Sequence, residues 1–261
     1  MQLSGAHVLV TGASRGIGAA IATGASARGA RVTLLARTRL EDRAAALGGH
    51  ALAVDLGDRA DRADVVARAE AQAGRPVDVL VNCAGVDNLG GLLAVGAEAV
   101  AGLFEVNLLA PCELVRQALP GMVARDRGHL VDVSSGFSAV SAPGLVPYAA
   151  SKAGLSHFHA GVRTELRGTG VGTTLVETGP VRTGMWDDIV AQGLASAAMR
   201  RFQRMRLARL SDPEQVAEAT LDAVEAGRRH VVLPRRMTPV MVLGWIPRRL
   251  SDLALTGVPR R

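Results

Sequence analysis

The chain has 261 residues, of which 48% are hydrophobic and 3% aromatic, so it is long enough to bury a substantial core in one large domain. Its net charge of +6 comes from the last quarter, because residues 191–261 hold 13 basic and 6 acidic side chains. An evenly basic chain would suggest nucleic-acid binding; this uneven distribution argues against it, and we expect no nucleic-acid partner.

The N-terminal segment and the cysteines indicate the compartment. The chain begins MQLSGAHVLV, which lacks the basic region and the long apolar core of a signal peptide. No apolar run reaches the roughly 18 residues that a membrane-spanning helix needs. Cys83 and Cys112 lie in apolar segments without metal-ligand spacing, as is typical of buried thiols in a reducing cytosol. We therefore expect a cytoplasmic protein without a metal site.

Short apolar runs alternate along the chain with longer segments of helical periodicity. This alternation predicts βαβ units and a parallel sheet that is covered by helices on both faces. We expect an α/β fold with a single doubly wound domain over residues 1–235 and a sheet of about seven strands. The strands are expected at 7–10, 31–35, 50–54, 77–81, 129–133, 170–176 and 230–233, and the helices at 16–28, 59–73, 98–123, 148–167 and 213–227.

The first predicted strand runs directly into TGASRGIG, residues 11–18, which opens the first predicted helix. Glycines at this spacing allow a tight turn and let the backbone approach a pyrophosphate, whose charge suits a helix N-terminus. We expect a Rossmann-type domain that binds a dinucleotide through this loop. The candidate contacts are Gly12, Ser14, Arg15, Gly16, Ile17 and Gly18.

The end of the second predicted strand indicates which dinucleotide binds. NAD usually meets a carboxylate there, about 20 residues after the glycine loop. This strand ends LLARTR, so Arg37 and Arg39 stand there and no acid occurs before Glu41. Arginine can bind a 2′-phosphate in a bidentate manner, and Arg15 projects from the glycine loop. We predict that NADP is preferred over NAD; the alternative is a solvated arginine pair.

The segment PYAASKAG contains the chain's only tyrosine, Tyr148, and its only lysine, Lys152. At i, i+4 spacing on a predicted helix, the two side chains share one face. A free phenol has a pKa of about 10, and a nearby ammonium group lowers it. Lysine is also a compact donor that titrates, whereas arginine is wider and stays charged. The pair predicts acid–base chemistry, although such pairs also occur by chance on solvated helix faces.

Other polar motifs end strands at the carboxyl edge of the sheet, where open α/β sheets bind ligands. Ser134 and Ser135 follow HLVDV, and NCAG follows VDVLV. These motifs, together with the glycine loop and PYAASK, follow one another in the order and spacing of one family. The sequence therefore resembles the short-chain dehydrogenase/reductase family over roughly residues 5–233. The family pattern T-G-x-x-x-G-x-G falls on residues 11–18, and N-N-A-G falls on NCAG, with Cys83 in place of the second Asn.

The resemblance implies catalytic roles for four residues. Tyr148 would exchange a proton with the carbonyl or carbinol oxygen, and Ser135 would hydrogen-bond that oxygen. Lys152 would bind the nicotinamide ribose and lower the pKa of Tyr148, and Asn107 would hold a water that links Lys152 to solvent. Ser134 is the neighbouring alternative to Ser135.

The resemblance also implies cofactor contacts from residues outside the glycine loop. Asp55 would contact the adenine, and Asn82, Val181 and Thr183 would contact other parts of the cofactor, together with Tyr148 and Lys152. One departure lies in TGPVRT, where Thr178 replaces the proline that usually opens this motif.

The C-terminal quarter departs furthest from the family. Residues 185–212, which include MRRFQRMRLARL, are expected to form a substrate-loop region, and residues 236–261 a basic, apolar extension. Pro239 limits any helix in the apolar run 237–246. Three roles stay open for the extension: a lid over an apolar pocket, a contact in a homo-dimer or homo-tetramer, or a peripheral membrane contact through Trp245 and the arginines.

Taken together, these patterns predict an NADP(H)-dependent oxidoreductase that interconverts a carbonyl and a secondary alcohol. The substrate is expected to be a small, largely apolar molecule. The alternative is a non-catalytic NADP-binding sensor or scaffold of the same fold, which would need the glycine loop but not the phenol of Tyr148.

Overall fold

A computed structural model of the chain describes residues 1–261 except 39, 88–89, 192, 205–208 and 243–261. Its strands form one parallel sheet in the order β3-β2-β1-β4-β5-β6-β7. This arrangement confirms the predicted doubly wound fold. The strands are β1 (His7–Thr11), β2 (Arg31–Ala36), β3 (His50–Ala53), β4 (Val79–Asn82), β5 (Gly128–Ser135), β6 (Val171–Thr178) and β7 (His230–Leu233).

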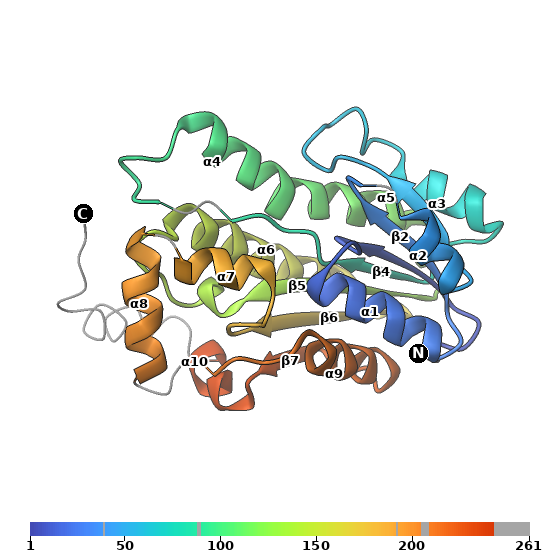
Figure 1. Ribbon diagram of the computed structural model, residues 1–261. Coiled ribbons are helices and arrows are strands. Elements are labelled where there is room, and N and C mark those ends of the chain that lie inside the picture. Colours follow the sequence, from blue (N-terminus) through green and yellow to red (C-terminus); the bar gives the residue numbers. More distant parts are fainter. Residues whose placement is uncertain (39, 88–89, 192, 205–208, 243–261) are drawn as a thin grey trace.

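Helices cover both faces of the sheet (Figure 1). One face carries α1 (Gly16–Ala27), α2 (Glu41–Ala46) and α9 (Pro213–Glu225), and the other carries α3 (Val65–Ala73), α5 (Ala110–Ala124) and α6 (Val146–Glu165). Successive strand residues enter opposite cores: Val8 and Val10 enter the first and Leu9 the second. Because both faces are buried, the strands are continuous apolar runs, and this explains why the sequence predicted them closely.

The strand order reverses beside β1, because the chain first builds β2 and β3 on one side and then returns to place β4 on the other. In open α/β sheets, this reversal forms a crevice at the carboxyl ends of the strands. The loops after β1 and β4 meet there. The Thr11 hydroxyl accepts hydrogen bonds from the N–H groups of Cys83 at 2.9 Å and Ala84 at 3.0 Å, which joins the two loops.

Two helices that the sequence did not predict lie together at one end of the sheet, α7 (Gly184–Ala191) and α8 (Gly193–Arg204) (Figure 1). They fall within the predicted substrate-loop region 185–212. With α4 (Ala97–Phe104) and the start of α6 they enclose a third apolar cluster, which includes Leu103, Tyr148, Trp186, Ile189 and Met199. This cluster brings the predicted catalytic tyrosine next to α7.

The helix predicted at 59–73 was wrong in extent, whereas the one predicted at 98–123 was right in extent but is not a regular α-helix throughout. The helix predicted at 59–73 begins only at Val65, because the Asp58 carboxylate accepts hydrogen bonds from the N–H groups of Ala60 and Asp61 and so stabilises a turn. The helix predicted at 98–123 is interrupted by the π-turn η1 (Glu105–Leu109) between α4 and α5. Pro111 has no N–H and cannot donate the bond that the Asn107 carbonyl would receive in an α-helix.

The described chain ends in the short turn η3 (Arg235–Met237) and α10 (Thr238–Val242). The Met237 side chain fills the space next to Gly136 and Gly179, where an added Cβ would collide with it. Most of the predicted extension, including Trp245, lies outside the described residues. Within the part that the structure describes, no helix combines the length and hydropathy required for crossing a membrane.

Gly18→Ala is expected to destabilise the protein and weaken dinucleotide binding. A Cβ at position 18 would collide with the carbonyl oxygen of Gly12, so the glycine loop would have to shift. Such overpacking costs about 1–3 kcal/mol, and roughly 2–4 °C of melting temperature is lost per kcal/mol in a chain of this size. Thermal unfolding with and without NADPH measures both effects.

Gly161→Ala is the matched control for this substitution. Gly161 lies exposed in α6, and an added Cβ meets nothing within 4 Å. Alanine there should stabilise the helix by about 0.5–1 kcal/mol. Equal melting temperatures for the two variants would contradict a close approach at Gly18.

Candidate active site

A cavity of about 440 Å³ opens where the loops after β1 and β4 meet. It extends from the glycine loop to the third apolar cluster, and most residues predicted as site residues line it. These are Gly12, Ser14, Arg15, Gly16, Ile17, Gly18, Arg37, Asp55, Ser135, Tyr148, Lys152, Val181 and Thr183. The side chains of the remaining two, Asn82 and Asn107, make other contacts.

The glycine loop forms one wall of the cavity. Gly12 has a φ of +68°, and an added Cβ would lie 2.8 Å from the Cα of Ala84 in the facing loop. Arg15 precedes α1 in an extended conformation, and the first turn of α1, from Gly16 to Gly18, lines the cavity. The unpaired N–H groups of this helix N-terminus are therefore available to an anionic group such as a pyrophosphate.

The corner at the ends of β2 and β3 bears arginine. Ala36 ends β2 without a carboxylate, and Arg37 follows it along the cavity wall. Arg43 of α2 donates to the Ser14 carbonyl oxygen at 3.0 Å, so a further guanidinium group adjoins the glycine loop. No sequence motif marked Arg43. Arg39, which the sequence placed at this corner, lies outside the described residues.

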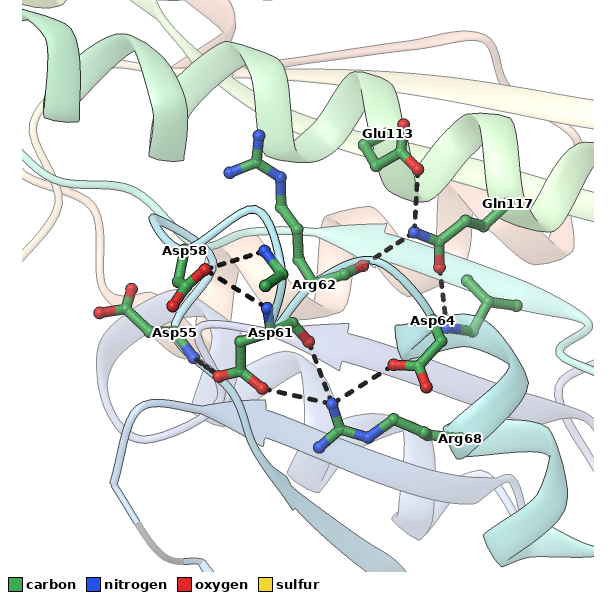
Figure 2. Close-up of polar contacts among 10 residues, drawn as sticks. Asp55, Asp58, Asp61, Arg62, Asp64, Arg68, Glu113 and Gln117 are labelled. Atoms are coloured by element: carbon green, nitrogen blue, oxygen red, sulfur yellow. Dashed lines mark hydrogen bonds and ion pairs between the residues drawn. The ribbon is translucent and has the colours of Figure 1, made fainter.

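A turn after β3 holds Asp55 (Figure 2). The N–H of Asp55 donates to the Asp61 carboxylate at 2.7 Å, and the Asp55 carboxylate accepts the N–H of Gly57 at 2.8 Å. Arg68 pairs with Asp61 at 3.3 Å and with Asp64 at 3.5 Å, which compensates the charge of this acidic turn. In Figure 2 the Asp55 carboxylate points away from Asp61, Asp64 and Arg68, and Asp55 lines the cavity.

Tyr148 and Ser135 meet at the other end of the cavity. Ser135 lies close enough to Tyr148 to lower the pKa of the phenol, and its hydroxyl accepts the N–H of Phe137 at 3.2 Å. The rings of Phe137 and Tyr148 pack edge to face, with centroids 6.3 Å apart. The Ser134 hydroxyl instead donates to the Lys152 carbonyl at 3.1 Å. The geometry therefore favours Ser135 over Ser134 as the partner of a reacting oxygen.

Lys152 is buried, with 5% of the residue exposed, and its Nζ donates to the Val133 carbonyl at 3.0 Å. Burial lowers the pKa of Lys152 to about 8, while the charges of Cys83 and Asp132 act to raise it. Gly85 leaves room in front of this side chain: an added Cβ would lie 3.5 Å from Nζ and 3.4 Å from Asn107 Oδ1. The side chains of Lys152 and Asn107 thus both lie next to Gly85.

Asn107 stands in the π-turn η1 and fixes the loop after β4. Its Oδ1 accepts the N–H of Val86 at 2.8 Å, and its Nδ2 donates to the Val86 carbonyl at 2.8 Å and to the Ser151 hydroxyl at 3.1 Å. Because both side-chain donors are used, the main-chain carbonyl is the group suited to hold the water that the resemblance implied.

The pKa of Tyr148 shifts in the direction opposite to the one expected. Burial raises it to about 12, and the charges of Asp87 and Cys83 add to the rise, whereas the nearby Ser135 side chain lowers it. Lys152 is not among the groups that produce the shift. At neutral pH the phenol is therefore protonated, which is the form that donates a proton.

Asn82 supports the sheet instead of facing the cavity. Its Nδ2 donates to Asp132 Oδ1 at 2.8 Å, and Asp132 Oδ2 is bonded to His159 Nδ1 at 2.7 Å. All three side chains are buried, and Asn82 and Asp132 are register partners on β4 and β5. The Asn82 side chain thus belongs to a buried polar network that spans two strands and α6, and the cofactor contact expected of this residue stays a prediction.

The cavity wall near Tyr148 includes residues that the sequence did not single out. The loop after β4, the turn after β5 and α7 contribute an apolar lining there, and the β4 loop and α7 also contribute two carboxylates. The apolar residues are Val86, Phe137, Met185, Trp186 and Ile189, and the acidic ones are Asp87 and Asp188. Asp87 stands two residues after NCAG, but no spacing rule marks that position as functional.

Comparison with known proteins agrees with this geometry. The family profile for short chain dehydrogenases matches residues 6–193. A short chain dehydrogenase of Pseudocercospora fijiensis is 34% identical over 92% of this chain and 84% of its own length. A solved short-chain dehydrogenase from Sphingobium yanoikuyae in complex with NADPH has a TM-score of 0.77 and 26% identity, covering 95% of both chains. One from Burkholderia phymatum in complex with NAD has a TM-score of 0.80 and 25% identity, covering 98% of this chain and 96% of its own.

Proposed function

Because the chain belongs to the short-chain dehydrogenase family, whose members are NAD(P)-dependent oxidoreductases, we propose that it interconverts a carbonyl and a secondary alcohol with NADP(H), using Tyr148 as the acid and base. One observation carries this proposal: Tyr148 and Ser135 line the same cavity as Lys152 and the glycine loop. A non-catalytic NADP sensor would need the glycine loop but not this pair of hydroxyl groups.

The proposed chemistry divides between cofactor and protein. The nicotinamide cofactor, when bound, supplies or accepts the hydride. In reduction, the Tyr148 phenol donates its proton to the carbonyl oxygen, and the Ser135 hydroxyl hydrogen-bonds the negative charge that develops there. One of the three Lys152 donors is held by Val133, which leaves two for ribose hydroxyls.

Consumption of NADPH over ketones and aldehydes of graded chain length tests the proposed reaction. The expected result is carbonyl-dependent NADPH consumption with one alcohol formed per NADPH. NADPH binding without consumption on any carbonyl compound would support the sensor instead. The apolar lining from Val86, Phe137, Trp186 and Ile189 supports a largely apolar substrate, so we expect longer or aromatic ketones to give lower KM values.

We also propose that NADP is the preferred cofactor. The support is the absence of a carboxylate at Ala36 together with Arg37 on the cavity wall. Arginine binds phosphate through paired, charge-assisted hydrogen bonds.

Arg37→Asp is expected to shift the preference from NADP towards NAD. The substitution removes a phosphate partner and supplies a carboxylate for the ribose hydroxyls. A charge-assisted hydrogen bond is worth about 1.5–3 kcal/mol, so NADP affinity should fall roughly ten- to a hundredfold. Dissociation constants for both cofactors, from fluorescence titration, measure the change.

Arg31→Asp provides a control with the same charge change at the other end of β2. Arg31 is exposed at the start of β2, at the opposite end from the cavity. It should leave the ratio of the two affinities unchanged. A wild-type protein that binds NAD as tightly as NADP would refute the role given to Arg37.

A further inference from the structure

We propose that Asp87 is a specificity-determining residue that accepts a hydrogen bond from a hydroxyl or ammonium group carried by the substrate near its reacting carbonyl. The inference rests on the proposed function and names its substrate class. That class is a largely apolar carbonyl compound with a hydrogen-bond donor and without a carboxylate.

Asp87 stands at the reacting end of the cavity. It lines the cavity together with Tyr148 and Ser135, and its charge is close enough to Tyr148 to raise the pKa of the phenol. The backbone next to Asp87 is held in place by Asn107. The N–H and the carbonyl of the preceding residue, Val86, are both hydrogen-bonded to the Asn107 side chain at 2.8 Å. The carboxylate is therefore held beside the site where a substrate carbonyl would meet the phenol.

One carboxylate oxygen of Asp87 has an unfilled hydrogen-bonding capacity. Oδ2 is shielded from water and has no hydrogen-bond partner among the described residues. Leaving a shielded acceptor without a partner is costly, and such groups in native proteins usually meet a water or a ligand. Because Asp87 belongs to the cavity wall, a donor group on the substrate can supply the missing partner after a small rotation of the side chain.

The charges around Asp87 make an anionic substrate unfavourable. Asp188 of α7 lines the same cavity, and its like charge, with burial, raises the pKa of Asp87. Arg15 acts on Asp87 in the opposite sense, but no ion pair joins the two side chains in the described part of the chain, and the Arg15 guanidinium lies beside Gly184. The two carboxylates at this end of the cavity repel anions and favour a hydroxyl or a cation.

A matched series of aryl ketones tests the proposal. In these ketones the substituent beyond the carbonyl carbon ends in a hydroxyl, an ammonium, a methyl or a carboxylate group. Each end group is tested on substituents of two or three lengths. For the wild-type enzyme, kcat/KM should be highest for the hydroxyl and ammonium ketones and lowest for the carboxylate. In Asp87→Ala, the ratio of kcat/KM for the hydroxyl ketone over the methyl ketone should fall roughly ten- to a hundredfold.

Two further variants separate charge from hydrogen bonding and from general effects. Asp87→Asn keeps an acceptor and removes the charge, so the preference for ammonium should fall more than the preference for hydroxyl. Asp187→Asn is the control, because Asp187 is exposed on the same helix as Asp188 and does not line the cavity. Asp187→Asn should leave every ratio of kcat/KM between the ketones unchanged.

Binding measured without turnover keeps this proposal separate from the proposed function. Calorimetry of the hydroxyl and methyl ketones on Tyr148→Phe loaded with NADPH should show tighter binding of the hydroxyl ketone, and the additional Asp87→Ala substitution should remove the difference. Equal affinities for the two ketones before that substitution, or a difference that survives it, would overturn the role of Asp87. A wild-type enzyme that shows this binding difference but reduces no ketone would instead contradict the proposed function alone.

Discussion

Tyr148→Phe is expected to lower kcat for ketone reduction by about 10²- to 10⁴-fold, the usual contribution of a positioned acid or base. The substitution removes only the phenolic hydroxyl and leaves a ring that can pack against Phe137. The affinity for NADPH should therefore be nearly unchanged. Steady-state NADPH consumption and fluorescence titration measure the two quantities on the same preparation.

The pH dependence provides an internal check on this role. With a pKa of about 12, Tyr148 is protonated at neutral pH, so it can donate in reduction but must first lose its proton to act as a base in oxidation. Alcohol oxidation should therefore rise with pH below that value, while reduction changes little through neutrality. Wild-type turnover in Tyr148→Phe would remove the residue from the catalytic chemistry.

Lys152→Arg is expected to be the second most damaging change, although it preserves a positive charge. Lys152 is 5% exposed, its Nζ lies 3.0 Å from the Val133 carbonyl, and Gly85 is directly in front of it. The wider guanidinium group does not fit there without displacing the loop after β4, at an overpacking cost of about 1–3 kcal/mol. We expect kcat to fall by about a hundredfold or more, as with loss of an acid–base group.

The same substitution should weaken NADPH binding, because the two donors proposed for the ribose hydroxyls are lost. The expected change in affinity is about tenfold, as for one charge-assisted hydrogen bond. Arg163→Lys is the reverse exchange on the exposed surface of the same helix and should leave both kcat and NADPH affinity unchanged. Retention of wild-type kcat by Lys152→Arg would show that positive charge alone is required.

The fold was largely predictable because its signals are local. The central strands are buried on both faces, so runs such as residues 8–10 stay apolar, and β1 begins where predicted. The glycine loop was predictable because its position between a strand and a helix leaves few other uses for glycines at that spacing. The order of the strands then brought Thr11 and the NCAG loop to the same crevice.

The parts that were missed depend on contacts between distant segments. The Asn82 side chain bonds to Asp132, 50 residues further along the chain, and no local pattern distinguishes that contact from a cofactor contact. Asp87 became noticeable only when folding placed it beside Tyr148 and Asp188. The π-turn at Asn107 follows in part from Pro111, a signal that was readable but was masked by the helical periodicity on both sides.

The pKa of Tyr148 illustrates the same limit in energetic terms. The i, i+4 spacing to Lys152 predicted a lower pKa from a neighbouring positive charge. In the folded protein the ammonium is bonded to the Val133 carbonyl, and burial of the phenol dominates. Burial is a property of the whole packed structure, so a spacing of four residues cannot reveal it.

The measurement closest to the central claim follows deuterium from the cofactor to the product. Wild-type protein is incubated with a ketone and with NADPH that carries deuterium at its transferable hydrogen position, and the alcohol is analysed by mass spectrometry. We predict one deuterium on the carbinol carbon with the wild-type protein and none above background with Tyr148→Phe in the same time. Tight NADPH binding with no labelled alcohol from any ketone of the series would contradict the assignment of this cavity as an oxidoreductase active site.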